Sequence, residues 1–338
     1  MTVRAVAPGR VNLIGEHTDY TGGLALPMAI DLRTTVELDP GGDEVVLRSD
    51  DEVGPAIVPI DLADPAMVEP PWARYVAGVV AEVRPRVGGT GVVCTTIPLG
   101  AGLSSSAALE VAVALALGFE GSPVDLALAC QRAEHRASGV PSGVLDQLAS
   151  AAGVDGAALL VDCTSLEVRP VPLPDDVAVV AIHSGQSRRL AGSAYADRRA
   201  ECEAAERIVG PLRTADRAAV EAIADPVLRR RARHVVTENR RVLDFVDRLA
   251  AADLDGAGAL LAASHASLRD DFEVSTPVVD ALVERLTAVP GVFGARIMGG
   301  GFGGSVVALA RPAVLSEGWT VQAVAGASRV GDEDEGAR

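Results

Sequence analysis

The chain contains no lysine, and all 30 of its basic residues are arginine. A P-loop nucleotide site needs a lysine directly after its second conserved glycine, so that class of site is excluded. Any phosphate chemistry must instead use arginine, backbone amides, hydroxyl groups and a metal ion. Together with the abundance of alanine, valine, glycine and arginine, the missing lysine indicates compositional bias rather than a function.

Cysteines, histidines and long apolar runs are also scarce. The four cysteines and five histidines are dispersed without the spacing of a metal site. Because neither a signal peptide nor a long apolar span is recognisable, we expect a reduced, cytoplasmic location. The formal net charge of −16 disfavours nucleic acid and anionic membranes as partners. We expect neither partner, and a monomer or weak homo-oligomer.

The most informative segment runs from Gly9 to Gly23 and reads GRVNLIGEHTDYTGG. A buried strand would show alternation or an apolar run, but here charged and polar residues stand among glycines. Glycine permits tight turns and a close approach of the backbone to a ligand. The pattern favours a ligand-binding loop over its alternative, a polar loop with one structural salt bridge.

A second segment, Pro98 to Glu110, reads PLGAGLSSSAALE and lies between a strand-like run and an apolar helix. Free N–H groups and the positive end of the helix dipole make such a helix start an anion site. The alternative is an ordinary strand-turn-helix connection with serine as the N-cap. Three consecutive serines exceed what a cap requires, so the segment indicates a phosphate site.

A third segment, Met298 to Leu309, reads MGGGFGGSVVAL. Its glycines fit the pattern G-x-G-x-x-G, but a dinucleotide-binding fingerprint must open a helix. The residues that follow are β-branched and apolar. We therefore expect a glycine-rich turn between two strands, at Ala295–Met298 and Ser305–Leu309.

Together, the three segments resemble the three motifs of the GHMP kinase superfamily. The first, GRVNLIGEHTDY followed by GG and then LP, resembles the signature of its galactokinase branch. Further matches are QRAEHRASGVPSGVLDQ, from Gln131 to Gln147, and SAYADRRAEC, from Ser193 to Cys202. The resemblance covers nearly the whole chain, from about Ala7 to Leu309.

The resemblance implies an α+β architecture, the two-domain GHMP kinase fold. Each domain would be a mixed or antiparallel sheet with helices, with the active site in the cleft between the domains. We expect an N-terminal domain over residues 1–172, with the sugar signature and phosphate loop. A C-terminal GHMP domain over residues 173–338 would carry the third motif. The proline-rich stretch from Val168 to Asp176 would cross between them.

Hydrophobic periodicity and turn residues support this organisation. Further strands are predicted at Val3–Ala7, Thr34–Leu38, Glu44–Arg48, Gly91–Ile97 and Val177–His183. Helices are predicted at Ser105–Leu117, Val124–Ala137, Ala194–Ile208, Arg217–Ala252, Ala257–Arg269 and Pro277–Thr287. The run Arg229-Arg230-Arg231 is interpreted as a solvated helical face, and the acidic tail from Asp332 to Glu335 as disordered.

The resemblance assigns catalysis to Asp146 and Arg10. In the family pattern, the aspartate of the Gly-x-x-Asp-Gln element accepts the proton of the sugar hydroxyl during phosphoryl transfer. Arg10 beside it would keep that carboxylate ionised and stabilise the charge that develops on the sugar oxygen. Without the resemblance, Asp146 could equally be a helix-cap carboxylate.

The resemblance also implies ATP and Mg²⁺ as cofactors. The residues that would bind ATP are Pro98, Gly100, Ala101, Gly102, Leu103, Ser104, Ser105, Ser106 and Ala107. The family match gives Ser106 and Glu134 as the Mg²⁺ ligands; one hydroxyl and one carboxylate suit a cation that keeps several waters. Taken alone, Glu134 would be interpreted as a surface residue of a helix.

Sugar recognition would use Glu16, His17, Asp19, the backbone near Gly143, and Tyr195. Two carboxylates and an imidazole can bond several hydroxyls in a fixed pattern, and such a site rejects analogues that lack one of them. The resemblance gives Asp19 the hydroxyls that separate galactose from its epimers. The alternative for Tyr195 is a helix aromatic packed at the domain junction.

These residues imply an enzyme that uses ATP to phosphorylate the anomeric hydroxyl of D-galactose, giving galactose 1-phosphate. Leucines flank the Asp-Gln pair where the family has methionine and an aromatic residue, and Ser142 and Ser305 stand where cysteine is frequent. Few residues precede Pro8, and the stretch from Ala310 to Gly326 is shorter than in typical members. A GHMP kinase for another sugar or a cyclitol, and a non-catalytic sugar sensor, are the alternatives. The intact phosphate loop and Asp146 favour an enzyme.

Overall fold

The computed structural model describes residues 1–186 and 191–330. For residues 191–193 it describes the backbone alone. The predicted disordered tail from Asp332 to Glu335 lies outside the described residues. The strands are β1 (Val3–Asn12), β2 (Leu24–Ala25), β3 (Pro27–Pro40), β4 (Glu44–Ser49), β5 (Ala56–Pro59), β6 (Gly89–Thr95), β7 (Ala157–Asp162), β8 (Val168–Pro172), β9 (Ala178–His183), β10 (Val292–Ile297), β11 (Ser305–Ala310), β12 (Trp319–Val321) and β13 (Ser328–Val330). The α-helices are α1 (Ala73–Val83), α2 (Ser105–Ala116), α3 (Pro123–Ser138), α4 (Leu145–Ala152), α5 (Ala191–Val209), α6 (Arg217–Glu221), α7 (Pro226–Ala250), α8 (Leu254–Asp270) and α9 (Pro277–Thr287). Short 3₁₀ helices lie at η1 (Asp19–Thr21) and η2 (Pro65–Met67).

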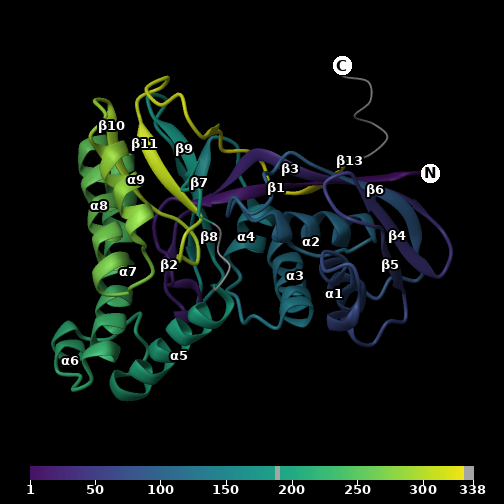
Figure 1. The fold of residues 1–338 in the computed structure, drawn as a ribbon, viewed down its shortest axis with the longest axis horizontal. Helices are drawn as coiled ribbons and strands as arrows, with labels where there is room; N and C mark the ends of the chain where they lie inside the picture. Colours follow the sequence, from purple (N-terminus) through teal and green to yellow (C-terminus); the bar gives the residue numbers. More distant parts are fainter. Residues whose placement is uncertain (187–190, 331–338) are drawn as a thin grey trace.

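The first half of the chain is built on a six-stranded sheet in the order β13-β1-β3-β6-β4-β5. Neighbouring strands run antiparallel except β4 and β6, which are parallel. Figure 1 shows α1, α2, α3 and α4 grouped below this sheet, and α2 and α4 pack directly on β1 and β3. The last strand, β13, returns from the second half of the chain to pair with β1.

The second half is built on a four-stranded antiparallel sheet in the order β10-β11-β9-β12. Helices α8 and α9 pack on β10, while α7 packs on α8 and α5 packs on α7. A small sheet of β2, β7 and β8 lies between the two larger ones (Figure 1), and both β2 and β8 contact α7. Among the helices in the described part of the chain, none is both long enough and apolar enough to cross a membrane.

The two halves share a hydrophobic core. Along β9, Val179 and Ala181 join the core under the first sheet, whereas Val180 and Ile182 pack in the core that includes α9. This division follows from the pleat, because successive side chains of a strand point to opposite faces. The second sheet therefore has a core on each face. The domain boundary between residues 172 and 173 stays a prediction.

The predicted hairpin of the third motif is confirmed. Strands β10 and β11 pair antiparallel with Ile297 opposite Val306, and the glycine-rich turn joins them. The first motif is only partly a loop, contrary to prediction, because β1 continues to Asn12. Gly9 lies within that strand, and the position requires glycine because a Cβ there would stand 2.6 Å from the Leu103 carbonyl oxygen of the phosphate loop.

Three other expectations are corrected. The single helix predicted from Arg217 to Ala252 is two helices, because Asp225 caps α7 and Pro226 occupies its first turn. The predicted crossing at Val168 begins as strand β8 rather than as a linker. The arginine run is not wholly solvated, since Arg231 is 2% exposed and ion-paired with Glu201 and Glu273.

Candidate active site

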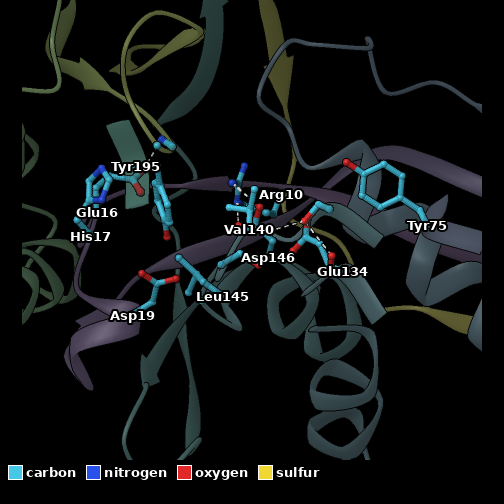
Figure 2. A pocket seen from close by; sticks show the side chains of 15 residues that line it. Arg10, Glu16, His17, Asp19, Tyr75, Glu134, Val140, Leu145, Asp146 and Tyr195 are labelled. Carbon is cyan, nitrogen blue, oxygen red and sulfur yellow. Dashed lines mark hydrogen bonds and ion pairs between the residues drawn. The ribbon is translucent and has the colours of Figure 1, made fainter. Parts of the chain in front are cut away.

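A cavity of about 390 Å³ gathers the predicted catalytic and sugar-binding residues. Figure 2 shows the sugar-signature side chains and Tyr195 on one side of the Arg10–Asp146 pair, and Glu134 and Tyr75 on the other. The cavity is lined by Arg10, Glu16, His17, Asp19, Tyr75, Glu134, Ser138, Val140, Ser142, Gly143, Leu145, Asp146, Tyr195, Gly299 and Gly300. Apart from the residues of the phosphate loop, every residue predicted to bind the sugar, to catalyse phosphoryl transfer or to bind the metal lies in the wall of this cavity.

Arg10 and Asp146 form a bidentate ion pair at the centre of the cavity. Arg10 comes from β1 and Asp146 from the first turn of α4. The Arg10 Nε lies 2.7 Å from Asp146 Oδ1 and its Nη2 lies 2.8 Å from Oδ2, while Nη1 donates to the Gly102 carbonyl oxygen at 2.7 Å. The Ser104 hydroxyl also donates to Asp146. Two parallel charge-assisted bonds fix the plane of the carboxylate, so its orientation is set before any ligand arrives.

Glu16 joins the sugar motif to the third motif. Its Oε1 accepts a hydrogen bond from the Gly299 backbone N–H at 2.7 Å and lies 3.3 Å from Arg296 Nη2. Arg296 is fully buried, and it also donates to the carbonyl oxygens of Asn12 and Leu13 at 2.6 Å each. One buried guanidinium therefore ties β10 to the start of the loop that carries Glu16.

His17 and Tyr195 form an aromatic wall beside Glu16. His17 has a left-handed φ of 60°, which is uncommon for a residue other than glycine and is tolerated where the surroundings enforce it. Its Nδ1 is hydrogen-bonded to the Tyr20 hydroxyl at 2.9 Å, and its ring centroid lies 5.4 Å from that of Tyr195 and 4.7 Å from that of Phe272. Tyr195 thus lines the cavity and also packs at the junction of the two halves.

Asp19 is a carboxyl group with an unusual environment. Burial, followed by the charges of Asp146 and Glu16, raises the pKa of Asp19 to about 7. A Cβ on Gly143 would lie 1.6 Å from Asp19 Oδ2, so the glycine leaves the space that this carboxylate occupies. Asp19 and the Gly143 backbone therefore lie against each other in the cavity wall, as the resemblance implied for two sugar-binding groups.

The phosphate loop has a backbone suited to an anion. Gly100 and Gly102 both have φ of 75°, and Ser104, the N-cap of α2, has a left-handed φ of 61°. Backbone turns of this kind direct N–H groups toward one point, and the helix start adds its dipole. The Ser305 hydroxyl donates to the Ala101 carbonyl oxygen at 2.5 Å, so the third motif supports the loop from behind.

A second cavity of about 310 Å³ adjoins the phosphate loop. It is lined by Thr34, Ser49, Asp51, Glu52, Trp72, Tyr75, Val93, Thr95, Leu99, Gly100, Ser105, Ser106 and Leu109. Gly100, Ser105 and Ser106 are therefore the predicted ATP-binding residues in its wall. Ala101, Leu103 and Ala107 are buried, and Pro98, Gly102 and Ser104 do not line it. Tyr75 lines both cavities, which places them next to each other.

The predicted Mg²⁺ ligands meet where the two cavities adjoin. Ser106 Oγ lies 3.5 Å from Glu134 Oε1, and Glu134 Oε2 accepts from the Ser142 hydroxyl at 2.7 Å and from Gln147 Nε2 at 2.9 Å. Burial is the largest influence on Glu134 and raises its pKa. Residues 1–186 and 191–330 contain no cluster of three or more His, Cys, Asp or Glu side chains that could hold a metal by themselves. One half-buried carboxylate and one hydroxyl fit Mg²⁺, which takes most of its ligands from water and phosphates.

Several lining residues were missed by reasoning from sequence. Trp72 lies directly before α1 and Tyr75 lies in its first turn, and the sequence pattern did not predict this helix. The sequence signal for them is the segment PPWARY, because two aromatic residues close together stand out in a chain with only 3% aromatic residues. Gly299 and Gly300 also line the first cavity, whereas the sequence pattern predicts them only as turn residues.

The comparisons with known proteins agree with this geometry. Residues 2–40 match the galactokinase galactose-binding signature, residues 74–154 the GHMP kinases N-terminal domain, and residues 245–317 the GHMP kinases C-terminal domain. The chain is 44% identical to a galactokinase of Chloroflexus aurantiacus, over 90% of this chain and 83% of that protein.

Solved structures give the same answer. The galactokinase of Lactococcus lactis in complex with galactose superposes with a TM-score of 0.89 at 30% identity, covering 97% of this chain and 95% of that one. The mevalonate kinase of Methanococcus jannaschii shares the fold, with a TM-score of 0.67 at 19% identity over 92% of this chain and 90% of that one.

Proposed function

The chain belongs to the galactokinase family of GHMP kinases, and on this premise we propose that it transfers the γ-phosphoryl group of ATP to the anomeric hydroxyl of D-galactose. The product is galactose 1-phosphate. The observation that carries the proposal is the place of the Arg10–Asp146 pair, which is bonded to the phosphate loop through Gly102 and Ser104 and faces the sugar-signature side chains.

The sugar occupies the 390 Å³ cavity, with its anomeric hydroxyl next to Asp146. Glu16, His17 and Asp19, the Gly143 backbone and Tyr195 bind the remaining hydroxyls and one face of the ring. The third motif fixes the Glu16 carboxylate through the Gly299 N–H, so the hydrogen-bonding pattern is set before the sugar binds. This preorganisation favours one arrangement of hydroxyls over another.

ATP lies along the phosphate loop, with its base in the second cavity and its phosphates at the start of α2. The backbone N–H groups from Gly100 to Ala107 bind the phosphates, because the chain has no lysine to do so. The junction at Tyr75 then directs the terminal phosphate toward the sugar cavity.

Asp146 accepts the proton of the attacking hydroxyl as the oxygen–phosphorus bond forms. Arg10 keeps Asp146 oriented and balances the negative charge on the sugar oxygen. Ser106 and Glu134 hold Mg²⁺. When bound, Mg²⁺ neutralises charge on the β- and γ-phosphate oxygens. We also propose that the protein is cytoplasmic and that it is a monomer or weak homo-oligomer.

The test is ADP release by purified protein with Mg-ATP and a panel of galactose, glucose, N-acetylgalactosamine, arabinose and cyclitols. A rate of ADP release that is higher with galactose than with every other compound supports the proposal. ADP release with another compound but not with galactose would support the same reaction on a different substrate. Binding of galactose without release from any compound would identify a sugar sensor.

A further inference from the structure

Behind the sugar motif, α7 carries three buried polar residues, besides the ion-paired Arg231, that the proposed chemistry does not use. Glu238 and His234 are fully buried and Asn239 is 7% exposed. None of them lines either cavity described above. A buried polar side chain costs stability unless its hydrogen bonds are made, so the partners of these three residues indicate why they are there.

All three residues bind the backbone of one loop, residues 15–24, which carries Glu16, His17 and Asp19. Glu238 Oε1 accepts from the Gly15 N–H at 3.0 Å. His234 Nε2 donates to the Glu16 carbonyl oxygen at 3.1 Å. Asn239 Oδ1 accepts from the Leu24 N–H at 2.7 Å.

The three residues are themselves held in place. Ser264 Oγ donates to Glu238 Oε1 at 2.6 Å, and Arg241 Nε donates to its Oε2 at 2.6 Å. Burial alone would raise the pKa of Glu238, but influences led by the charge of Arg241 lower it to about 2, so the group is a carboxylate at neutral pH. Because this carboxylate accepts every hydrogen bond it makes, a neutral amide cannot replace it without facing a donor with a donor.

His234 also reaches the sugar site through packed rings. Its ring centroid lies 4.6 Å from that of Phe272, and the Phe272 ring in turn lies 4.7 Å from the ring of His17. Burial lowers the pKa of His234, so Nδ1 accepts from the Ser267 hydroxyl at 2.9 Å while Nε2 carries the proton donated to Glu16. The backbone of Glu16 is therefore bonded to α7 directly, and the ring of His17 is connected to it through Phe272.

We propose that His234, Glu238 and Asn239 are positioning residues for sugar binding, which hold the loop of residues 15–24 so that Glu16, His17 and Asp19 meet the sugar hydroxyls. This inference rests on the proposed function. The loop belongs to the first half of the chain and α7 to the second, so sugar affinity depends on the packing between the halves. The nucleotide cavity contains none of the contacts involved and is unaffected.

The test compares Glu238→Met and Asn239→Leu with the wild-type protein. Glu238→Met keeps the length of the side chain but removes the acceptor for the Gly15 N–H, while Asn239→Leu removes the acceptor for the Leu24 N–H. We expect the KM for galactose to rise about tenfold or more in each, with kcat and the KM for ATP within about threefold of wild type. Calorimetric titration with galactose in the absence of nucleotide should show the same loss of affinity.

A matched control separates positioning from simple loss of stability. Leu249 is a buried apolar residue of α7, about three turns beyond Glu238. Leu249→Ala leaves a cavity in the same helix and lowers the melting temperature, but we expect it to keep the wild-type KM for galactose. If one of the two variants of the polar residues does not fold, the other still decides the outcome, because each removes a different hydrogen bond.

Two results would overturn the inference. A galactose KM within twofold of wild type in the folded variants would show that the loop keeps its position without these bonds. An equal rise in Leu249→Ala would show that any loosening of α7 has the same effect. If the wild-type protein itself does not turn over galactose, the proposed function fails first, and that result is distinguishable because no variant is needed to obtain it.

Discussion

The sugar cavity and the phosphate loop present their ligands with different kinds of group. Around the sugar cavity the groups are side chains, several of them charged and buried, and each is held by a partner such as Gly299, Arg296 or Tyr20. Around the phosphate loop they are mainly backbone N–H groups, directed by left-handed residues and the start of α2. A site of the first kind should be sensitive to single side chains and to pH. A site of the second kind should depend on backbone conformation alone.

The largest effect is expected at the point where the two regions meet. Asp146→Ala removes the proton acceptor and the partner of Arg10, so turnover should fall by about 10²–10⁴-fold or more. ATP binding should stay within a few-fold of wild type, because the backbone of the phosphate loop is unchanged. Steady-state ADP release and nucleotide titration measure the two quantities. Near-normal turnover would remove Asp146 from the mechanism.

A matched pair of glycine substitutions tests the contrast between the regions directly. In Gly143→Ala the new Cβ would lie 1.6 Å from Asp19 Oδ2, so the carboxylate must move and the KM for galactose should rise about tenfold or more. In Gly100→Ala the new Cβ meets no atom within 4 Å, and the left-handed φ of 75° costs only about 1–2 kcal/mol. We expect the second change to raise the KM for ATP by a few-fold and to leave galactose binding alone.

The outcome that contradicts this contrast is a crossed result. A Gly143→Ala protein with altered ATP affinity and normal galactose affinity would mean that the two regions do not divide the substrates as described.

The pH dependence should differ between the two substrates. Because the pKa of Asp19 is raised to about 7, its carboxyl group is protonated at pH 6 and ionised at pH 8 in the free protein. If the ionised form binds the sugar, kcat/KM for galactose rises with pH through about 7. A pH profile of the wild type against Asp19→Asn checks this, since the variant should lack that inflection. An inflection retained in Asp19→Asn would assign it to another group.

The same shift has a consequence for stability. The folded protein binds the Asp19 proton more tightly than the unfolded chain, whose value is the ordinary 3.8, so folding gains from this group at low pH. That gain is lost as the pH rises through about 7. The unliganded wild type should therefore lose more stability than Asp19→Asn between pH 5 and pH 8.

The smallest effect is expected from an ion pair beside the loop of residues 15–24. Arg213 pairs with Asp162 and also donates to the Gly22 carbonyl oxygen at 3.0 Å. Both side chains are about a quarter exposed, so Asp162→Asn should cost about 1 kcal/mol or less in the free energy of unfolding. The Arg213 hydrogen bond is the largest influence that lowers the pKa of Asp162, to about 2. The difference from wild type in urea unfolding should be present at pH 6 and should disappear as the pH falls toward 2.

Much of the site could be predicted because its chemistry restricts the residue types. Two of the three motif segments, Gly9–Gly23 and Met298–Leu309, line the first cavity together although they are far apart in sequence, and Pro98–Glu110 lines the adjoining one. The roles assigned to individual residues remain predictions. The break between α6 and α7 was not predicted, although Asp225 followed by Pro226 is a typical helix start.

What could not be predicted depends on long-range packing. The Gly15–Glu238 hydrogen bond joins residues 223 positions apart, and the local pattern of α7 cannot tell which of its charged residues is buried. Arg231 was misinterpreted for the same reason. Trp72 belongs to the nucleotide cavity only because the segment before α1 folds back beside the phosphate loop, which no local pattern indicates.

The central claim is that the γ-phosphoryl group of ATP is transferred to the anomeric oxygen of galactose, with the Arg10–Asp146 pair beside that oxygen. The most direct measurement is carbon and phosphorus NMR of the product formed from ATP and galactose labelled with ¹³C at the anomeric carbon, with Asp146→Ala as the parallel sample. We predict phosphorus coupling to the labelled carbon with the wild-type protein and, over the same reaction time, at least about a hundredfold less product with Asp146→Ala. Phosphate on another carbon, no product with the wild type, or equal product from both proteins would contradict it.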